Sequence, residues 1–360
     1  MKNPFPPRCL MPVVVGIALC ALSPAMAENL MIGFNRVTCL AKSDTFVSVP
    51  FMKHPVKLAN TLGALPTIAS GLATLTPTEA TTLVADELKE SHYIRFTSGA
   101  LAGHWYDISG NTASSITIDL NGEDGTKLAP GDAFVVVEYW TLDTLFPPNT
   151  QTTLHKSSGN LGYQQKSKLL IPNIEGTGTD LPADAVYFVT ADGWKKSTAG
   201  FPIAGDTILP PGLPFIIRHP EGVAKTDFEP EGRVLRSRDS VVLAQEQSSD
   251  QDNTVAVFRP VDVLLSDAGL NENAFASSAS HESSARKDQL LVFDNSKTDF
   301  NKSPSAIFYK YSQNWFLDDG KAASNPAATS TNVLSASGAL IIRKAKGANA
   351  SPIWNNEPTY

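Results

Sequence analysis

The chain has 360 residues, of which 36 are acidic and 29 are basic, so its formal net charge is −7. An acidic chain without basic clusters argues against anionic partners, both nucleic acid and anionic membrane surfaces. Two of its three cysteines lie within the first 20 residues, so Cys39 is alone in the remainder and cannot form a disulfide within it.

The first 27 residues have the three parts of a secretory signal peptide. Lys2 and Arg8 give a basic start, Leu10 to Leu22 is an apolar core, and Ala25-Met26-Ala27 is a small-residue cleavage site. Cleavage after Ala27 would leave 27 basic and 36 acidic residues, a net charge of −9. No later stretch approaches the ~18 apolar residues of a membrane helix, so no membrane span is expected.

Strand signals follow along the rest of the chain and predict an all-β protein with little helix. The predicted strands are short, rich in β-branched or aromatic residues, and bounded by Gly, Pro, Asn and Asp. They cover Thr45 to Phe51, Ser114 to Leu120, Ala133 to Trp140, Lys168 to Pro172, Ala185 to Val189, Thr254 to Pro260, Leu290 to Asp294 and Ala306 to Tyr311. Only Thr76 to Leu88 resembles a helix, because Pro77 and Glu79 fall in its first turn.

Three similar ten-residue segments predict three related β-hairpin units that form small barrels or sandwiches. They are LAPGDAFVVV (128–137), LPPGLPFIIR (209–218) and LSASGALIIR (334–343). The predicted units cover residues 28–150, 151–225 and 226–360, the last with a C-terminal tail.

The second and third units are the most alike. An offset of 121 residues aligns Leu169-Leu170 with Leu290-Leu291, and Trp194 with Trp315, without a gap. A weaker similarity relates SDTFVSVPF (43–51) to QDNTVAVFRP (251–260).

Five aromatic residues are candidates for the structural core, because a repeated unit must fill the same internal space each time. They are Trp105, Trp194, Trp315, Phe134 and Phe215. An aromatic binding platform is the alternative for the three tryptophans. Two arginines, Arg218 and Arg343, end similar apolar strands, where they would either reach solvent or bind an anionic ligand.

No catalytic, metal-binding or cofactor-binding motif stands out. The sequence lacks G-x-S-x-G and H-E-x-x-H, its six histidines lie far apart, and no glycine-rich loop joins a strand to a helix. The S-x-x-K of Ser284 and Lys287 falls in a serine-rich loop without its partner motifs. The oxygen-rich segments 119–126 and 294–301 fit turns better than Ca²⁺ loops.

Several runs together resemble an uncharacterised family of exported proteins from verrucomicrobial bacteria and their relatives. These runs are TCLAKSDTFVSVPF, YIRFTSGALAGHWYDISGN, YWTLDTLFP, DNTVAVFRPVDVLLSDAGL, LLVFDNSK and the closing WNNEPTY. The resemblance covers essentially the whole chain after the signal peptide. It implies a β-rich extracytoplasmic protein and brings no activity, ligand or catalytic residue.

These patterns predict an exported structural or binding protein of the cell envelope or extracellular space, without a cofactor. Its expected partner is a glycan, another cell-surface component or a second copy of itself. The alternative is a secreted, glycosidase-like hydrolase with a carboxylate pair drawn from acids such as Asp107, Asp119 and Glu138.

Cleavage of the signal peptide gives the first testable prediction. Material exported by an expressing bacterium should begin at Glu28, because cleavage follows a small-x-small pattern. N-terminal sequencing or intact mass checks this. A lipidated start at Cys20 would contradict it, and Leu19 in front of that cysteine argues against lipidation.

Overall fold

The computed structural model describes residues 31–320, 324–348 and 350–360. The predicted signal peptide (1–27), Cys9 and Cys20 lie outside the described residues. Within these ranges the chain is built from short strands, and its single α-helix, α1 (Leu142–Leu145), is one turn long, which confirms the all-β class. None of the helices in the described part is long and apolar enough to cross a membrane.

Seven strands form the first sheet, sheet I, in the order β4-β10-β7-β8-β9-β6-β5, and every pair is antiparallel. The strands are β4 (Leu58–Thr61), β5 (Thr67–Ala69), β6 (Leu72–Leu75), β7 (His92–Phe96), β8 (Trp105–Asn111), β9 (Ile116–Asp119) and β10 (Ala133–Glu138). Alternate residues such as Ile94, Phe96, Phe134 and Val136 bury their side chains in one core, as strand geometry requires.

Two five-stranded sheets follow, and they have the same internal order. Sheet II runs β14-β13-β12-β16-β3, from β3 (Ser43–Val47), β12 (Lys168–Ile171), β13 (Ala185–Thr190), β14 (Gly193–Lys196) and β16 (Phe215–His219). Sheet III runs β24-β23-β22-β26-β20, from β20 (Gln251–Val255), β22 (Gln289–Val292), β23 (Ala306–Tyr311), β24 (Asn314–Leu317) and β26 (Leu340–Lys344).

Two-stranded ladders flank these sheets at matching points along the chain. Beside sheet II, β11 (Trp140–Thr141) pairs with β15 (Ile208–Leu209), and β2 (Val37–Cys39) pairs with β17 (Thr226–Phe228). Beside sheet III, β21 (Val263–Leu264) pairs with β25 (Asn332–Leu334), and β19 (Asp239–Val242) pairs with β27 (Ile353–Asn356). A further ladder joins β1 (Ile32–Phe34) to β18 (Glu231–Arg233).

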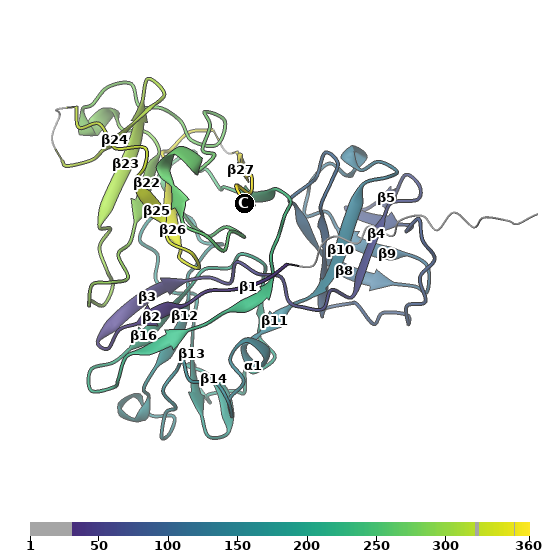
Figure 1. Ribbon diagram of the computed structural model, residues 1–360, viewed down its shortest axis with the longest axis horizontal. Helices are drawn as coiled ribbons and strands as arrows, with labels where there is room; N and C mark the ends of the chain where they lie inside the picture. The colour runs from purple at the N-terminus through teal and green to yellow at the C-terminus, as the bar shows by residue number, and fades with distance from the viewer. Residues whose placement is uncertain (1–30, 321–323, 349) are drawn as a thin grey trace, which may run out of the picture. The chain divides into compact units, whose positions relative to one another are not determined.

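Sheet II draws its edge strand from far back in the chain. Strand β3 precedes all of sheet I in the sequence, yet Ser43 to Val47 pair residue by residue with β16. Figure 1 shows this purple strand beside the green β16. The predicted unit 28–150 therefore holds both sheet I and one strand of sheet II, because strand pairing depends on register and not on closeness in sequence.

Two of the three ten-residue segments lie at matching positions in sheets II and III, and the third lies in sheet I. Residues 209–218 run from the last residue of β15 into β16, and residues 334–343 run from the last residue of β25 into β26, so these two match. Residues 128–137 instead lead into β10 of sheet I, which pairs with β4 and β7 in a different strand order.

The expected helix at Thr76 to Leu88 is wrong. This segment is irregular, with a β-bridge from Pro77 to Leu62 and turns only from Ala85 onwards, and Asp86 adopts a left-handed φ of 57°. The side chain of the buried Asn111 organises it, accepting from the Leu88 amide (3.0 Å) and donating to the Val84 carbonyl (2.7 Å). Side-chain hydrogen bonds of this kind compete with helix formation.

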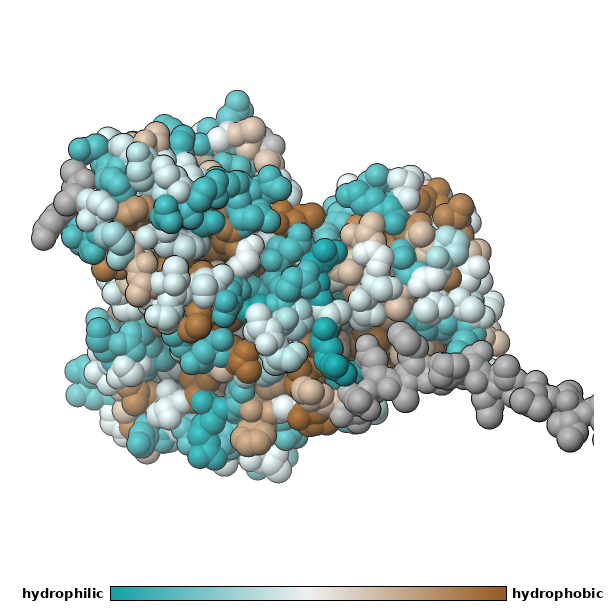
Figure 2. All heavy atoms as spheres, turned by 45° about the horizontal axis from the view of Figure 1, so that its top comes forward, coloured by the Kyte–Doolittle hydropathy of each residue, from teal (hydrophilic) through white to brown (hydrophobic). Residues whose placement is uncertain are grey.

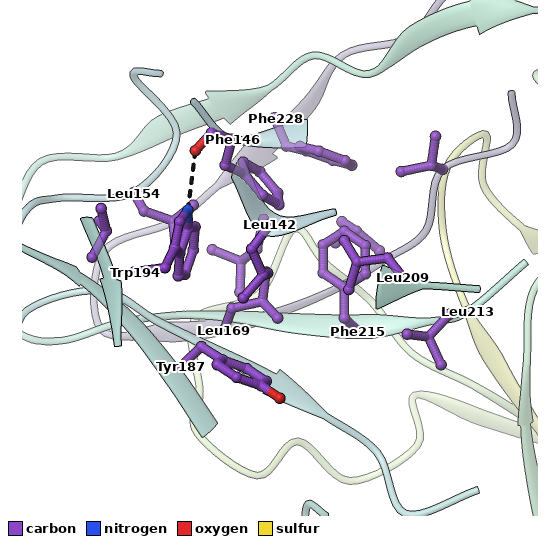
Figure 3. Packing of buried hydrophobic residues seen from close by; sticks show 14 of the residues in the cluster. Leu142, Phe146, Leu154, Leu169, Tyr187, Trp194, Leu209, Leu213, Phe215 and Phe228 are labelled. Carbon is purple, nitrogen blue, oxygen red and sulfur yellow. Dashed lines mark hydrogen bonds between the residues drawn. The ribbon is translucent and has the colours of Figure 1, made fainter. Parts of the chain in front are cut away.

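The five aromatic core candidates differ in burial. Trp194 is 0% exposed in the core of sheet II, which also holds Phe215, and its indole N–H donates to the Phe146 carbonyl at 3.1 Å (Figure 3). Phe134 is buried in the core of sheet I. Trp315 and Trp105 are only half-buried and pack against the edges of other clusters.

This difference predicts unequal costs for the two matching tryptophans. Trp194→Ala should lower the free energy of unfolding by about 3–5 kcal/mol, because it opens a cavity and leaves a buried carbonyl unpaired. Trp315→Ala should cost about 1–2 kcal/mol, because that ring is already partly hydrated. Urea unfolding of both variants checks this. Equal losses, or loss of a ligand without loss of stability, would contradict the assignment of Trp194 to the core.

Candidate functional site

Arg218 and Arg343 occupy matching places in sheets II and III, and each holds a carboxylate of the neighbouring edge strand. Arg218 donates to both oxygens of Asp44, from Nε at 2.6 Å and Nη2 at 2.7 Å. Arg343 donates in the same way to Asp252, at 2.7 and 2.9 Å. These hydrogen bonds raise the pKa of each arginine. Each guanidinium group is therefore paired within the protein, although its side chain remains partly exposed to solvent (28% for Arg218 and 21% for Arg343).

The loop between β22 and β23 of sheet III extends over edge strand β3 of sheet II. The Asp44 amide donates to the Asp299 carbonyl at 2.8 Å, and the Asn301 amide donates to the Asp44 carboxylate at 2.8 Å. Arg218 also donates to the Asn301 side-chain oxygen at 2.6 Å. One loop of sheet III thus completes the hydrogen bonding of a buried carboxylate in sheet II.

The loop between β12 and β13 of sheet II does the same for edge strand β20 of sheet III. The Asp252 amide donates to the Gly178 carbonyl at 2.9 Å, and the Asp180 amide donates to the Asp252 carboxylate at 3.0 Å. Asp180 and Asn301 both adopt left-handed φ angles, 52° and 48°, which Asp and Asn tolerate. The two sets of contacts together are called the reciprocal clasp below.

An open groove with a volume of about 660 Å³ lies beside the part of the clasp formed by the β22–β23 loop. Its walls come from β2, from the segment 292–296 after β22, and from β25 with the turn that follows it. The half-buried side chains of Val37, Leu40 and Val292 give it apolar surface. The Phe293 ring stacks on Phe46 with centroids 4.3 Å apart.

Polar side chains stand along the same groove. Asp262 accepts from the Asn332 side chain (2.8 Å) and from the Ala336 amide (2.9 Å). Asp294 accepts from the amide (2.8 Å) and the hydroxyl (2.6 Å) of Ser296, and these hydrogen bonds lower the pKa of its carboxyl group. The groove therefore presents carboxylate, amide and hydroxyl groups held in fixed directions next to apolar surface.

Such a surface suits a polyhydroxylated ligand. Carboxylates can accept from several hydroxyl groups at once, and apolar side chains can pack against the C–H faces of a sugar ring. Because its hydrogen bonds favour the ionised form, Asp294 is a hydrogen-bond acceptor at neutral pH and a poor proton donor.

The three acids suggested for a hydrolase all lie in or at the end of sheet I strands, and each has its own partner. Asp107 accepts from the Tyr139 hydroxyl, Glu138 pairs with Lys53 at 2.7 Å, and Asp119 accepts from the Asn121 amide at 2.9 Å. None of the three lines the groove.

The remaining sequence motifs lie in turns, loops and short 3₁₀ helices. Segment 119–126 is a turn in which Asp124 caps the short 3₁₀ helix Gly125–Lys127. Segment 294–301 belongs to both the groove and the clasp. Ser284 lies in the short 3₁₀ helix Ser283–Ala285, and the Lys287 amide donates to Ser278 Oγ. Among the described residues, no group of three or more His, Cys, Asp or Glu side chains could hold a metal ion.

A serine–histidine pair that the sequence did not suggest lies at the end of sheet II. Ser167 Oγ is 2.9 Å from His219 Nδ1, and Thr226 Oγ1 is 2.7 Å from His219 Nε2. Burial, with His155 nearby, lowers the pKa of His219 to about 4. Ser167 and His219 are fully buried, so no substrate reaches them. In sheet III the buried pair of Asp288 and Lys344 takes this place, which indicates a structural role for both pairs.

Comparison with known proteins finds no matching family model, no similar curated protein and no similar solved structure. The candidate site is therefore defined by the geometry of this chain alone.

Proposed function

We propose that this chain is an exported, non-enzymatic binding protein of the cell envelope or extracellular space, and that its groove binds a glycan. The observation that carries the proposal is the composition of the groove, where Asp262, Asp294 and Asn332 face an open channel next to apolar surface. An open groove of this kind can accommodate part of a polymer that continues beyond the site. The secretory signal expected at residues 1–27 supports a location where glycans are present.

We propose further that sheets II and III, with their flanking ladders, are two copies of one internal repeat. The support is the shared strand order, the shared arginine–aspartate pairs and the reciprocal clasp. In this interpretation sheet I is an insertion in the first copy, between β3 and β11. The repeat also supplies matched control positions for experiments on the groove.

A hydrolase remains the second candidate, and one observation favours it. Asp262 and Asp294 line one groove, and glycosidases act through two carboxyl groups on either side of the scissile bond. One of the two carboxyl groups must, however, donate a proton to the leaving group. The pKa of Asp294 is lowered, and both oxygens of Asp262 already accept hydrogen bonds from the protein, so neither is placed as that donor. Binding without turnover is therefore the function that the groove supports better.

A blocking substitution tests the groove. Ser296 is exposed on the groove wall, and Glu175 is its exposed counterpart in sheet II, at the offset of 121 residues. The wild-type protein should bind at least one cell-wall or extracellular polysaccharide in a glycan screen. Ser296→Trp should weaken that binding by about tenfold or more through steric exclusion, and Glu175→Trp should leave it unchanged. Isothermal titration with the best polysaccharide measures both.

Three outcomes would overturn the proposal. The first is wild-type protein that binds no polysaccharide in the screen, and the second is equal loss of binding in the two tryptophan variants. The third is release of reducing sugar from the bound polysaccharide, abolished by Asp262→Asn, which would establish the hydrolase instead.

A further inference from the structure

A second surface lies on sheet II, at the loop that precedes β12. This loop is closed at its base, where the Lys166 amide donates to Ser157 Oγ (3.0 Å) and the Ser158 amide donates to the Gln164 carbonyl (3.1 Å). Its outer turn carries Leu161 and Tyr163, which are 52% and 85% exposed. We call residues 161–163 the apolar tip.

Single exposed apolar side chains are ordinary, and Figure 2 shows hydrophilic and hydrophobic residues interspersed over one face of the protein. The matching loop of sheet III distinguishes the tip from this background. That loop closes through the same hydrogen bond, from the Lys287 amide to Ser278 Oγ at 3.0 Å. Its exposed residues at the offset of 121 are Glu282 and Ser284. The loop conformation therefore does not require apolar residues at the tip.

The charge around the tip differs from that of the whole chain. No acidic residue occurs between Asp143 and Glu175, whereas Lys156 and Lys166 are exposed at the two ends of the loop. Much of the negative charge is elsewhere, since residues 58–138 contain ten acidic and three basic residues, a net charge of −7. Salt screens charges beyond about 8 Å, so the charges of the loop itself matter most for a surface that contacts the tip.

We propose that the apolar tip docks on an anionic phospholipid surface. Leu161 and Tyr163 would enter the interfacial layer, where tyrosine is favoured, and Lys156 and Lys166 would contact lipid phosphates. Two side chains on one turn are far smaller than the roughly 800 Å² per partner of a stable protein interface, whereas a bilayer can accommodate a small tip. The net negative charge of the whole chain opposes a broad electrostatic contact with an anionic membrane. It does not oppose a contact limited to the tip and its two lysines.

Vesicle flotation tests the proposal with liposomes of phosphatidylglycerol and phosphatidylcholine, and with liposomes of phosphatidylcholine alone. Wild-type protein without its signal peptide should float with the phosphatidylglycerol vesicles. Leu161→Glu combined with Tyr163→Ser, which copies the sheet III loop, should lower the bound fraction by about tenfold. Ile203→Ser is the matched control, because it removes another exposed apolar side chain (75%) of the sheet II region and should change nothing.

Lys156→Glu combined with Lys166→Glu provides a second variant that leaves the tip intact, and it should bind as weakly as the tip variant. Wild-type protein that does not float, or a tip variant that floats equally well, would overturn the proposal. Recovery of an acidic protein partner through the tip, without lipid binding, would overturn it too. Ser296→Trp should float normally, so the outcome is independent of glycan binding in the groove.

Discussion

The constraint on which the rest of the structure depends is the burial of two carboxylates on edge strands. Asp44 and Asp252 are almost fully buried, and an unpaired charge in such a place would cost several kcal/mol. Each carboxylate gains an arginine from its own sheet and a backbone amide from a loop of the other sheet. The same loops cover the two strand edges, which would otherwise be open to pairing with other chains. Neither sheet satisfies its own edge strand alone.

The clasp also positions the groove. Next to the clasp contacts, the Asn295 side chain accepts from the Phe46 amide (2.9 Å) and donates to the Phe46 carbonyl (2.8 Å). Asp294 and Ser296 flank this anchor and line the groove. A wall held at its centre by two hydrogen bonds keeps its polar groups in fixed directions, which lowers the entropy lost when a ligand binds. The anchoring of sheet II to sheet III and the shape of the proposed site thus depend on one loop.

Local patterns in the sequence predicted the all-β class. They also predicted one strand, Ala306–Tyr311, with the bounds that the structure shows. Contacts that depend on distant pairing could not be predicted. Arg218 was a candidate, but its partner Asp44 lies 174 residues away across the whole of sheet I. The helix predicted at Thr76 to Leu88 does not form, because the distant Asn111 side chain bonds the backbone near its end and the Thr78 amide bonds the Thr61 carbonyl near its start. The groove draws on several separate segments, none with a motif of its own.

Hydrogen exchange followed by mass spectrometry tests the reciprocal clasp most directly, on Asp44→Asn and Asp252→Asn. Each change keeps the size of the side chain and removes the charge that the arginine requires. Asp44→Asn should speed exchange in residues 294–301 of the other sheet by about tenfold or more and leave residues 176–180 protected. Asp252→Asn should do the reverse. If each substitution affects only its own sheet, or neither loop changes its exchange, the two sheets do not hold each other in the way described.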